Sequence, residues 1–103
     1  EKNMNITKNT TENTVTLTLS GRLDTVTSTM LSTELDIVFA GGSPNLIFNL
    51  AELDYISSAG LRVFLTAQKR VRAQGGEMKV TGANNSVKEI FEVTGFAGIM
   101  NIE

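Results

Sequence analysis

The apolar residues of this chain change their spacing from two to about 3.6 residues several times, and this succession constrains the fold most. Residues 15–20 alternate strictly between aliphatic and hydroxyl side chains, which predicts a strand with one buried and one polar face. Residues 4–7 also alternate, and the polar run 9–13 between the two segments has turn chemistry. We therefore expect the chain to open with a β-hairpin.

Three later segments follow the spacing of a helix that buries one stripe. The first has Asp24, Thr25 or Thr27 as its N-cap and stops at residues 41–44, and the second stops at residues 75–76. The stripes consist of Leu31, Leu35, Val38 and Phe39; Leu61, Phe64, Leu65, Gln68 and Val71; and Val87, Ile90, Phe91 and Thr94. The sequence thus predicts three amphipathic helices.

Short β-prone segments separate these helices. Residues 45–50 are apolar on both faces, as in a central strand, and residues 77–81 form another short strand. The third helix closes at Gly95, which leaves residues 96–102 as a terminal strand or coil. Because helices alternate with strands after the hairpin, part of the sheet should be parallel, with right-handed crossovers. A chain of 103 residues fits a single α/β domain, residues 1–103.

The absent residue types exclude most catalytic and metal sites. There is no His and no Cys, which excludes Ser-His and Cys-His pairs, thiolate or imidazole metal ligands and disulfides. Nine Lys and Arg against eleven Asp and Glu argue against a nucleic-acid partner. Apolar runs are too short to span a membrane, and residues 1–3 do not resemble a signal peptide. We expect no membrane partner and a cytoplasmic protein.

The most informative segment is residues 50–65, in which a strand leads into Ser57 and Ser58 at a helix start. Serine is a favoured N-cap, so one interpretation is that both hydroxyls cap the first turn. The other is a phosphorylation site, because the amino end of a helix tolerates the charge of about −1.5 to −2 that a phosphoserine carries. A phosphate there would leave the fold intact and change the surface.

Three motifs carry a resemblance that extends over nearly the whole chain. Residues 54–62 read Asp-Tyr-Ile-Ser-Ser-Ala-Gly-Leu-Arg, residues 21–24 read Gly-Arg-Leu-Asp, and residues 90–96 read Ile-Phe-Glu-Val-Thr-Gly-Phe. In this order and spacing they resemble the STAS domain family, specifically the bacterial anti-sigma factor antagonists, or anti-anti-sigma factors. The resemblance implies a single STAS-like domain: a small mixed sheet with an opening hairpin and crossover helices packed mainly on one face.

The resemblance also implies a partner-switching protein with no catalysis and no cofactor of its own. In such a pathway the unphosphorylated antagonist binds an anti-sigma factor that is also a GHKL-type serine kinase, and the sigma factor is released. The kinase uses ATP to phosphorylate the antagonist, the complex dissociates, and a PP2C-type phosphatase reverses the modification. A phosphate dianion that is buried in the interface without a matching charge costs several kcal/mol of binding free energy. Because a loss of about 4 kcal/mol converts a nanomolar complex into a micromolar one, a single phosphate is enough to separate the partners.

Matching the family's signature with the glycines in register places the phosphate acceptor at Ser58. Ser57 stands where the family often has Asp, and Ala59 where it often has Ser, so Ser57 is a rival acceptor. Asp24 is implied to contact the partner's kinase domain. The expected partner-binding residues are Asp24, Thr25, Ser57, Ala59, Gly60 and Arg62.

Each of these residues also has a structural interpretation. Asp24 is a natural N-cap, Gly60 a packing residue of the first helical turn, and Arg62 part of a solvated face. We expect Asp54 to be a cap or turn residue. A pair of Asp24 and Asp54 acting as acid and base, or holding Mg²⁺, is the weakest hypothesis because no third oxygen ligand is indicated.

Two other functions stay open at this point. One is an STAS scaffold without a phosphorylation switch, or a subunit of a transport or lipid assembly. The other is a small nucleotide-binding or hydrolysing enzyme that uses Ser58 or Asp24. The lack of His, Cys and any Gly-rich phosphate loop disfavours the enzyme.

Overall fold

A computed structural model describes residues 4–42 and 44–103, so residues 1–3 and Ser43, which falls in the expected first helix stop, lie outside the described residues. After an opening hairpin, strands and helices alternate as the spacing predicts. The elements are β1 (Met4–Thr11), β2 (Thr14–Leu23), α1 (Thr25–Ala40), β3 (Asn45–Ile56), α2 (Ser58–Ala73), β4 (Met78–Thr81), α3 (Asn85–Val93), the 3-10 turn η1 (Phe96–Gly98) and β5 (Asn101–Ile102).

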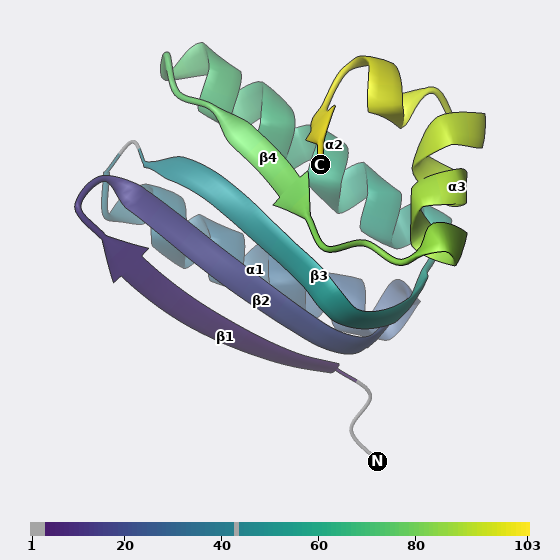
Figure 1. Cartoon of the computed structure of the whole chain (residues 1–103). Helices are drawn as coiled ribbons and strands as arrows, with labels where there is room; N and C mark the ends of the chain where they lie inside the picture. Colours follow the sequence, from purple (N-terminus) through teal and green to yellow (C-terminus); the bar gives the residue numbers. More distant parts are fainter. Residues whose placement is uncertain (1–3, 43) are drawn as a thin grey trace.

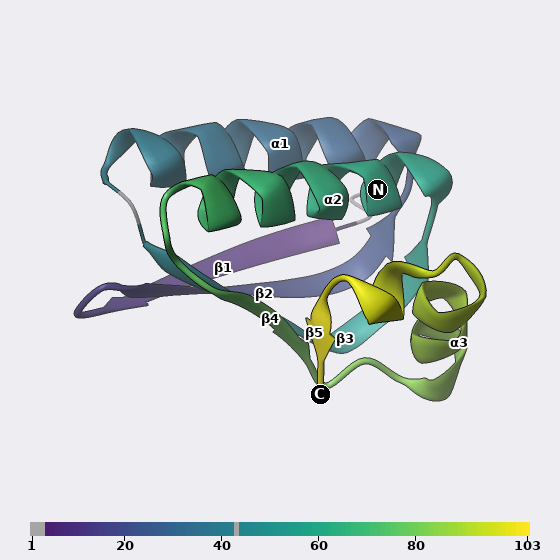
Figure 2. The same ribbon diagram turned by 90° about the horizontal axis from the view of Figure 1, so that it is seen from above.

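The sheet has the strand order β1-β2-β3-β4-β5 (Figure 1). The hairpin pair β1 and β2 is antiparallel, and each later neighbour is parallel to the strand before it. Helices α1 and α2 lie side by side on one face of the sheet, as Figure 2 shows from above. The expected mixed sheet with crossover helices mainly on one face is confirmed.

The core lies between the sheet and these two helices. The alternating residues of β2 turn Val15, Leu17 and Leu19 inward, where they are buried, while the intervening hydroxyl residues on the opposite face stay half-buried. Phe48 of β3 and Phe64 of α2 meet edge to face, with ring centroids 4.7 Å apart. Burial of these aliphatic and aromatic side chains supplies the main driving force for folding.

The hairpin is tighter than the sequence indicates. Only Glu12 and Asn13 form its turn, and residues 9–11, which were expected in the turn, belong to β1 because ladder pairing continues to Thr11 and Thr14. Glu12 takes a left-handed conformation, with φ of 54°, that reverses the chain.

The central strand is longer than the sequence indicates. We expected it to end at Leu50, but β3 continues to Ile56. Two register shifts explain the difference: Thr18 and Ser20 of β2 face Asn49 and Glu52 of β3, so β3 holds an extra residue there, and a second shift follows at Gly21. Bulges of this kind break the period-two alternation on which the prediction rested.

The helix ends agree with the expected stops to within a residue or two. Gly41 is the C-cap of α1, and Gln74, one residue before the expected stop, caps α2. Gly95 follows α3 with a φ of 83°, which favours glycine and ends the helix. Residues 96–102, for which the sequence predicts a terminal strand or coil, form the 3-10 turn η1 and the two-residue strand β5.

Candidate functional site

The starts of α1 and α2 are adjacent because β2 and β3 are parallel and end at the same edge of the sheet. Leu23, the last residue of β2, pairs with Ile56, the last residue of β3. One residue further on, the N–H of Ser57 donates a hydrogen bond to the carbonyl oxygen of Leu23 at 2.8 Å. The two helix N-caps, Asp24 and Ser57, are therefore held side by side.

Asp24 is the N-cap of α1, so its structural interpretation is confirmed. Its Oδ1 accepts a hydrogen bond from the N–H of Thr27 at 2.9 Å, and the Thr27 hydroxyl accepts one from the Asp24 N–H at 2.8 Å. These contacts form a capping box with Thr in the place of the usual Glu. The Thr27 hydroxyl also donates to the Arg22 carbonyl at 2.7 Å, which links the cap to the end of β2.

The carboxyl of Asp24 is held in its charged form. The hydrogen bond from the Thr27 N–H lowers the pKa of Asp24 most, followed by the Thr27 hydroxyl, while partial burial acts in the opposite direction. Further, smaller lowering contributions to this pKa come from the Val26 N–H and from the positive charge of Arg22. The start of α1 thus presents a fixed, half-buried carboxylate at neutral pH.

The two neighbouring serines differ in what their hydroxyls do. Ser57 is the N-cap of α2: its Oγ accepts a hydrogen bond from the Gly60 N–H at 3.1 Å, and the residue is half-buried. Ser58 is the first helical residue and is exposed, and its hydroxyl makes no hydrogen bond within the part of the chain that the structure describes. The interpretation of both serines as caps is therefore wrong for Ser58.

Gly60 packs inward. It is buried, and a Cβ added to it would lie 2.7 Å from Cγ and Cδ2 of Leu23, which is itself fully buried. Glycine is required here because the first turn of α2 passes so close to the end of β2. The packing interpretation accounts for Gly60, and its role in partner binding stays a prediction.

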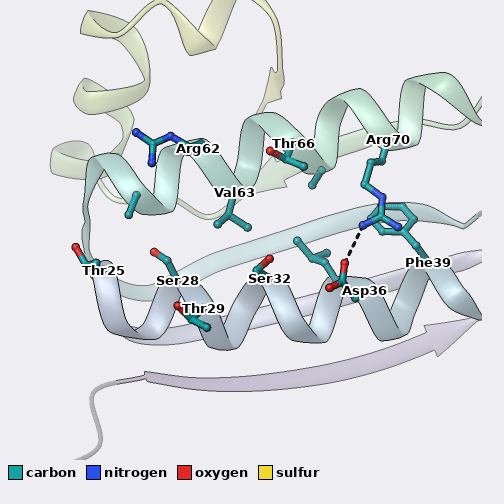
Figure 3. A pocket seen from close by; sticks show the side chains of 13 residues that line it. Thr25, Ser28, Thr29, Ser32, Asp36, Phe39, Arg62, Val63, Thr66 and Arg70 are labelled. Carbon is teal, nitrogen blue, oxygen red and sulfur yellow. Dashed lines mark hydrogen bonds and ion pairs between the residues drawn. The ribbon is translucent and has the colours of Figure 1, made fainter.

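Thr25, Ala59 and Arg62 line a groove of about 450 Å³ between α1 and α2 (Figure 3). The groove begins beside the two helix starts, and hydroxyl groups of both helices line it. Near its other end Arg70 forms an ion pair with Asp36 at 3.0 Å and lies over the Phe39 ring. Three of the expected partner-binding residues are therefore brought to one continuous surface.

Two features of this surface were not found from the sequence. The Arg22 guanidinium stacks on the Tyr55 ring, 4.1 Å from its centroid, across the β2–β3 pair. Asp54 is an exposed residue inside β3 and neither a cap nor a turn residue, so that expectation was wrong. Both depend on the bulged register of β3, which the period-two pattern does not reveal.

The acidic residues that the structure describes do not gather into a metal site. Within residues 4–42 and 44–103, no three Asp or Glu residues lie close enough together to hold a metal ion. Among the described helices, none has the length and apolar character needed to cross a membrane.

Comparison with known proteins identifies the family. The STAS domain pattern matches residues 5–103. The protein BtrV of Bordetella bronchiseptica, assigned by inference as an anti-sigma factor antagonist, is 36% identical over 82% of this chain and 72% of its own. The anti-sigma-B factor antagonist of Bacillus subtilis is 28% identical over 97% of this chain and 91% of its own.

Solved structures agree on the fold. The anti-sigma factor antagonist SpoIIAA in its unphosphorylated form superposes with a TM-score of 0.84 at 19% identity, covering 96% of this chain and 88% of its own. The Bacillus cell fate determinant SpoIIAA in its phosphorylated form gives a TM-score of 0.77 at 20% identity, covering 96% of this chain and 91% of its own. From the matched pattern, the sequence identity and the shared fold, the chain belongs to the STAS domain family and, within it, to the anti-sigma factor antagonists.

Proposed function

We propose that this chain is the antagonist in a partner-switching pathway and that Ser58 is its switch. Unphosphorylated, it binds an anti-sigma factor of the GHKL kinase type, and the sigma factor is released. Phosphorylation of Ser58 ends the complex, and a PP2C-type phosphatase restores it. This role is regulatory and not catalytic, and because its partners act on transcription it belongs in the cytoplasm.

The single observation that carries the choice of Ser58 is the difference between the two serine hydroxyls. The Ser57 oxygen is already the acceptor for the Gly60 N–H, so modifying it would remove the cap of α2. Ser58 is exposed, and its hydroxyl is free of hydrogen bonds to the described residues. A transferase can therefore reach Ser58 without disturbing the helix start.

The chemical step is a phosphoryl transfer. The Ser58 Oγ forms a bond to the γ-phosphorus of ATP, the bond from that phosphorus to the ADP oxygen breaks, and the hydroxyl proton passes to a base of the kinase. The product carries about −1.5 to −2 charges where a neutral hydroxyl had been. A partner that covers the hydroxyl must then desolvate an anion that it has no group to match.

The partner surface would extend from Ser58 to the neighbouring helix start. Thr25, Ala59 and Arg62 line the groove, and the Asp24 carboxylate caps α1 one residue before Thr25. Gly60 supports this surface from below by letting α2 approach Leu23. Charged groups at such an interface contribute mainly to orientation and specificity.

Mass spectrometry of the chain isolated from its host tests the acceptor directly. We expect one phosphate, mapped by fragmentation to Ser58, that is absent in Ser58→Ala and retained in Ser57→Ala. Ser86→Ala, which removes an exposed serine from the first turn of α3, is the matched control. Undiminished phosphate in Ser58→Ala would exclude Ser58, and unmodified protein in growing and stressed cells alike would favour the scaffold without a switch.

A further inference from the structure

Arg62 is a cation one helical turn beyond Ser58. Both residues belong to α2, at positions i and i+4, which places them on the same face with Cβ atoms roughly 5–6 Å apart. Both are exposed. The spacing alone brings the guanidinium within reach of a group attached to the Ser58 oxygen.

The side chain of Arg62 also points in the required direction. Helical side chains lean towards the N-terminus of their helix, so the later residue of an i, i+4 pair covers the earlier one. Figure 3 shows the Arg62 side chain reaching from α2 towards the amino end of that helix. This is the end at which Ser58 lies.

Arg62 has no other partner within the described part of the chain. Two other arginines are engaged: Arg22 stacks on Tyr55, and Arg70 pairs with Asp36 and covers Phe39. Arg62 makes no ion pair, hydrogen bond or ring contact with the described residues. Its charge is therefore available to a ligand, a partner or a modification.

We propose that Arg62 is the internal counter-ion of the phosphate on Ser58. The inference rests on the proposed function, because it takes Ser58 as the modified residue. The planar guanidinium can donate two parallel hydrogen bonds to phosphate oxygens, which Lys cannot do. Phosphorylation then changes the surface twice, since it adds an anion at Ser58 and withdraws the Arg62 cation from a partner.

The pairing is tested by the second pKa of the phosphoserine, which ordinarily lies near 6. Phosphoserine is built into position 58 during synthesis of the full chain, and ³¹P NMR follows its titration. A nearby cation favours the dianion, so we expect this pKa to be lower in the wild-type background than in Arg62→Gln by at least about 0.3 units. This pKa difference should shrink in 1 M salt, because salt ions there screen the attraction between exposed charges over a distance of about 3 Å.

Two further variants make the result specific. Arg72→Gln removes an exposed cation from the last turn of α2 and is expected to leave the phosphoserine pKa at the wild-type value. Arg62→Lys keeps the positive charge but loses the planar guanidinium that can donate two parallel hydrogen bonds. We therefore expect its phosphoserine pKa to lie between those of the wild type and Arg62→Gln. Equal pKa values in the wild type and Arg62→Gln, with both chains folded by circular dichroism, would overturn the pairing.

This experiment separates the two proposals because it requires no kinase. If the phosphoserine pKa does not respond to Arg62 while host protein is phosphorylated on Ser58, the pairing is wrong and the switch stands. If the pKa responds while host protein never carries phosphate, the pairing is a property of the surface and the proposed switch is wrong.

Discussion

At the scale of single residues, two serines that are identical in the sequence acquire different chemistry from one backbone hydrogen bond. The Ser57 Oγ accepts a hydrogen bond from the Gly60 N–H, whereas Ser58 is the first residue of the helix and its side chain is exposed to solvent. Capping therefore assigns the structural role to the first serine. The second serine has an exposed side chain and is the residue that we propose is phosphorylated.

Gly60 allows the helix start to approach the end of β2, and we expect Gly60→Ala to lower the free energy of unfolding by about 1–3 kcal/mol. The added Cβ would lie 2.7 Å from two atoms of Leu23 and 3.2 Å from Cγ1 of Ile56, and both side chains are buried. Helix propensity alone predicts the opposite sign, because it favours Ala over Gly by about 1 kcal/mol.

Urea unfolding measures the effect of Gly60→Ala, with Gly98→Ala as the control. A Cβ added at Gly98 meets nothing within 4 Å, so we expect little change there. A Gly60→Ala variant as stable as the wild type would mean that Leu23 moves aside without cost.

At the scale of elements, the helix starts could be predicted closely and the register of the central strand could not. Asp24 was one of three candidate caps for α1, and its capping box selects it. Residues 51–56 gave no period-two pattern because two bulges place the buried residues of β3 three apart, at Leu50, Leu53 and Ile56. The contact of Arg22 with Tyr55 depends on that register, so it could not be predicted from the sequence.

The cap of α1 should make stability depend on pH. The pKa of Asp24 is lowered in the folded chain, so its carboxylate stabilises the fold fully above the ordinary value of 3.8 and loses this effect as pH falls through the folded value. Asp24→Asn keeps an N-cap acceptor without the charge. We expect it to be less stable than the wild type at neutral pH, with the difference shrinking in acid.

Urea unfolding of both chains at a series of pH values tests this dependence. Asp54→Asn, which removes an exposed carboxylate from β3, is the matched control for the loss of one negative charge. A stability difference between Asp24→Asn and the wild type that stays constant from neutral pH into acid would mean that the charge of the Asp24 carboxylate does not stabilise the fold.

At the scale of the whole molecule, the proposed switch residue Ser58 lies at the edge of the sheet where β2 and β3 end. The core contains three fully buried phenylalanines, and the Phe64 ring contacts those of Phe48 and Phe91. The alternation of helices and strands was enough to predict this architecture and its partly parallel sheet. The shape of the groove was not, because it depends on how α1 and α2 pack against each other.

We expect phosphoserine at position 58 to leave this scaffold unchanged, because the Ser58 side chain is exposed and takes no part in the core. In ¹H–¹⁵N spectra of the full chain, shifts between the two forms should be confined to the starts of α1 and α2. Changes that extend through β4 and α3 would mean that the phosphate acts by refolding the chain.

In the proposed switch, one phosphate on Ser58 decides which partner this chain binds. The direct measurement is calorimetric titration of the host's GHKL-type anti-sigma factor with the unmodified chain and with the chain carrying phosphoserine at 58. We expect tight binding of the first and a loss of roughly a thousand-fold for the second, equivalent to about 4 kcal/mol. Equal affinity of the two forms would contradict the account.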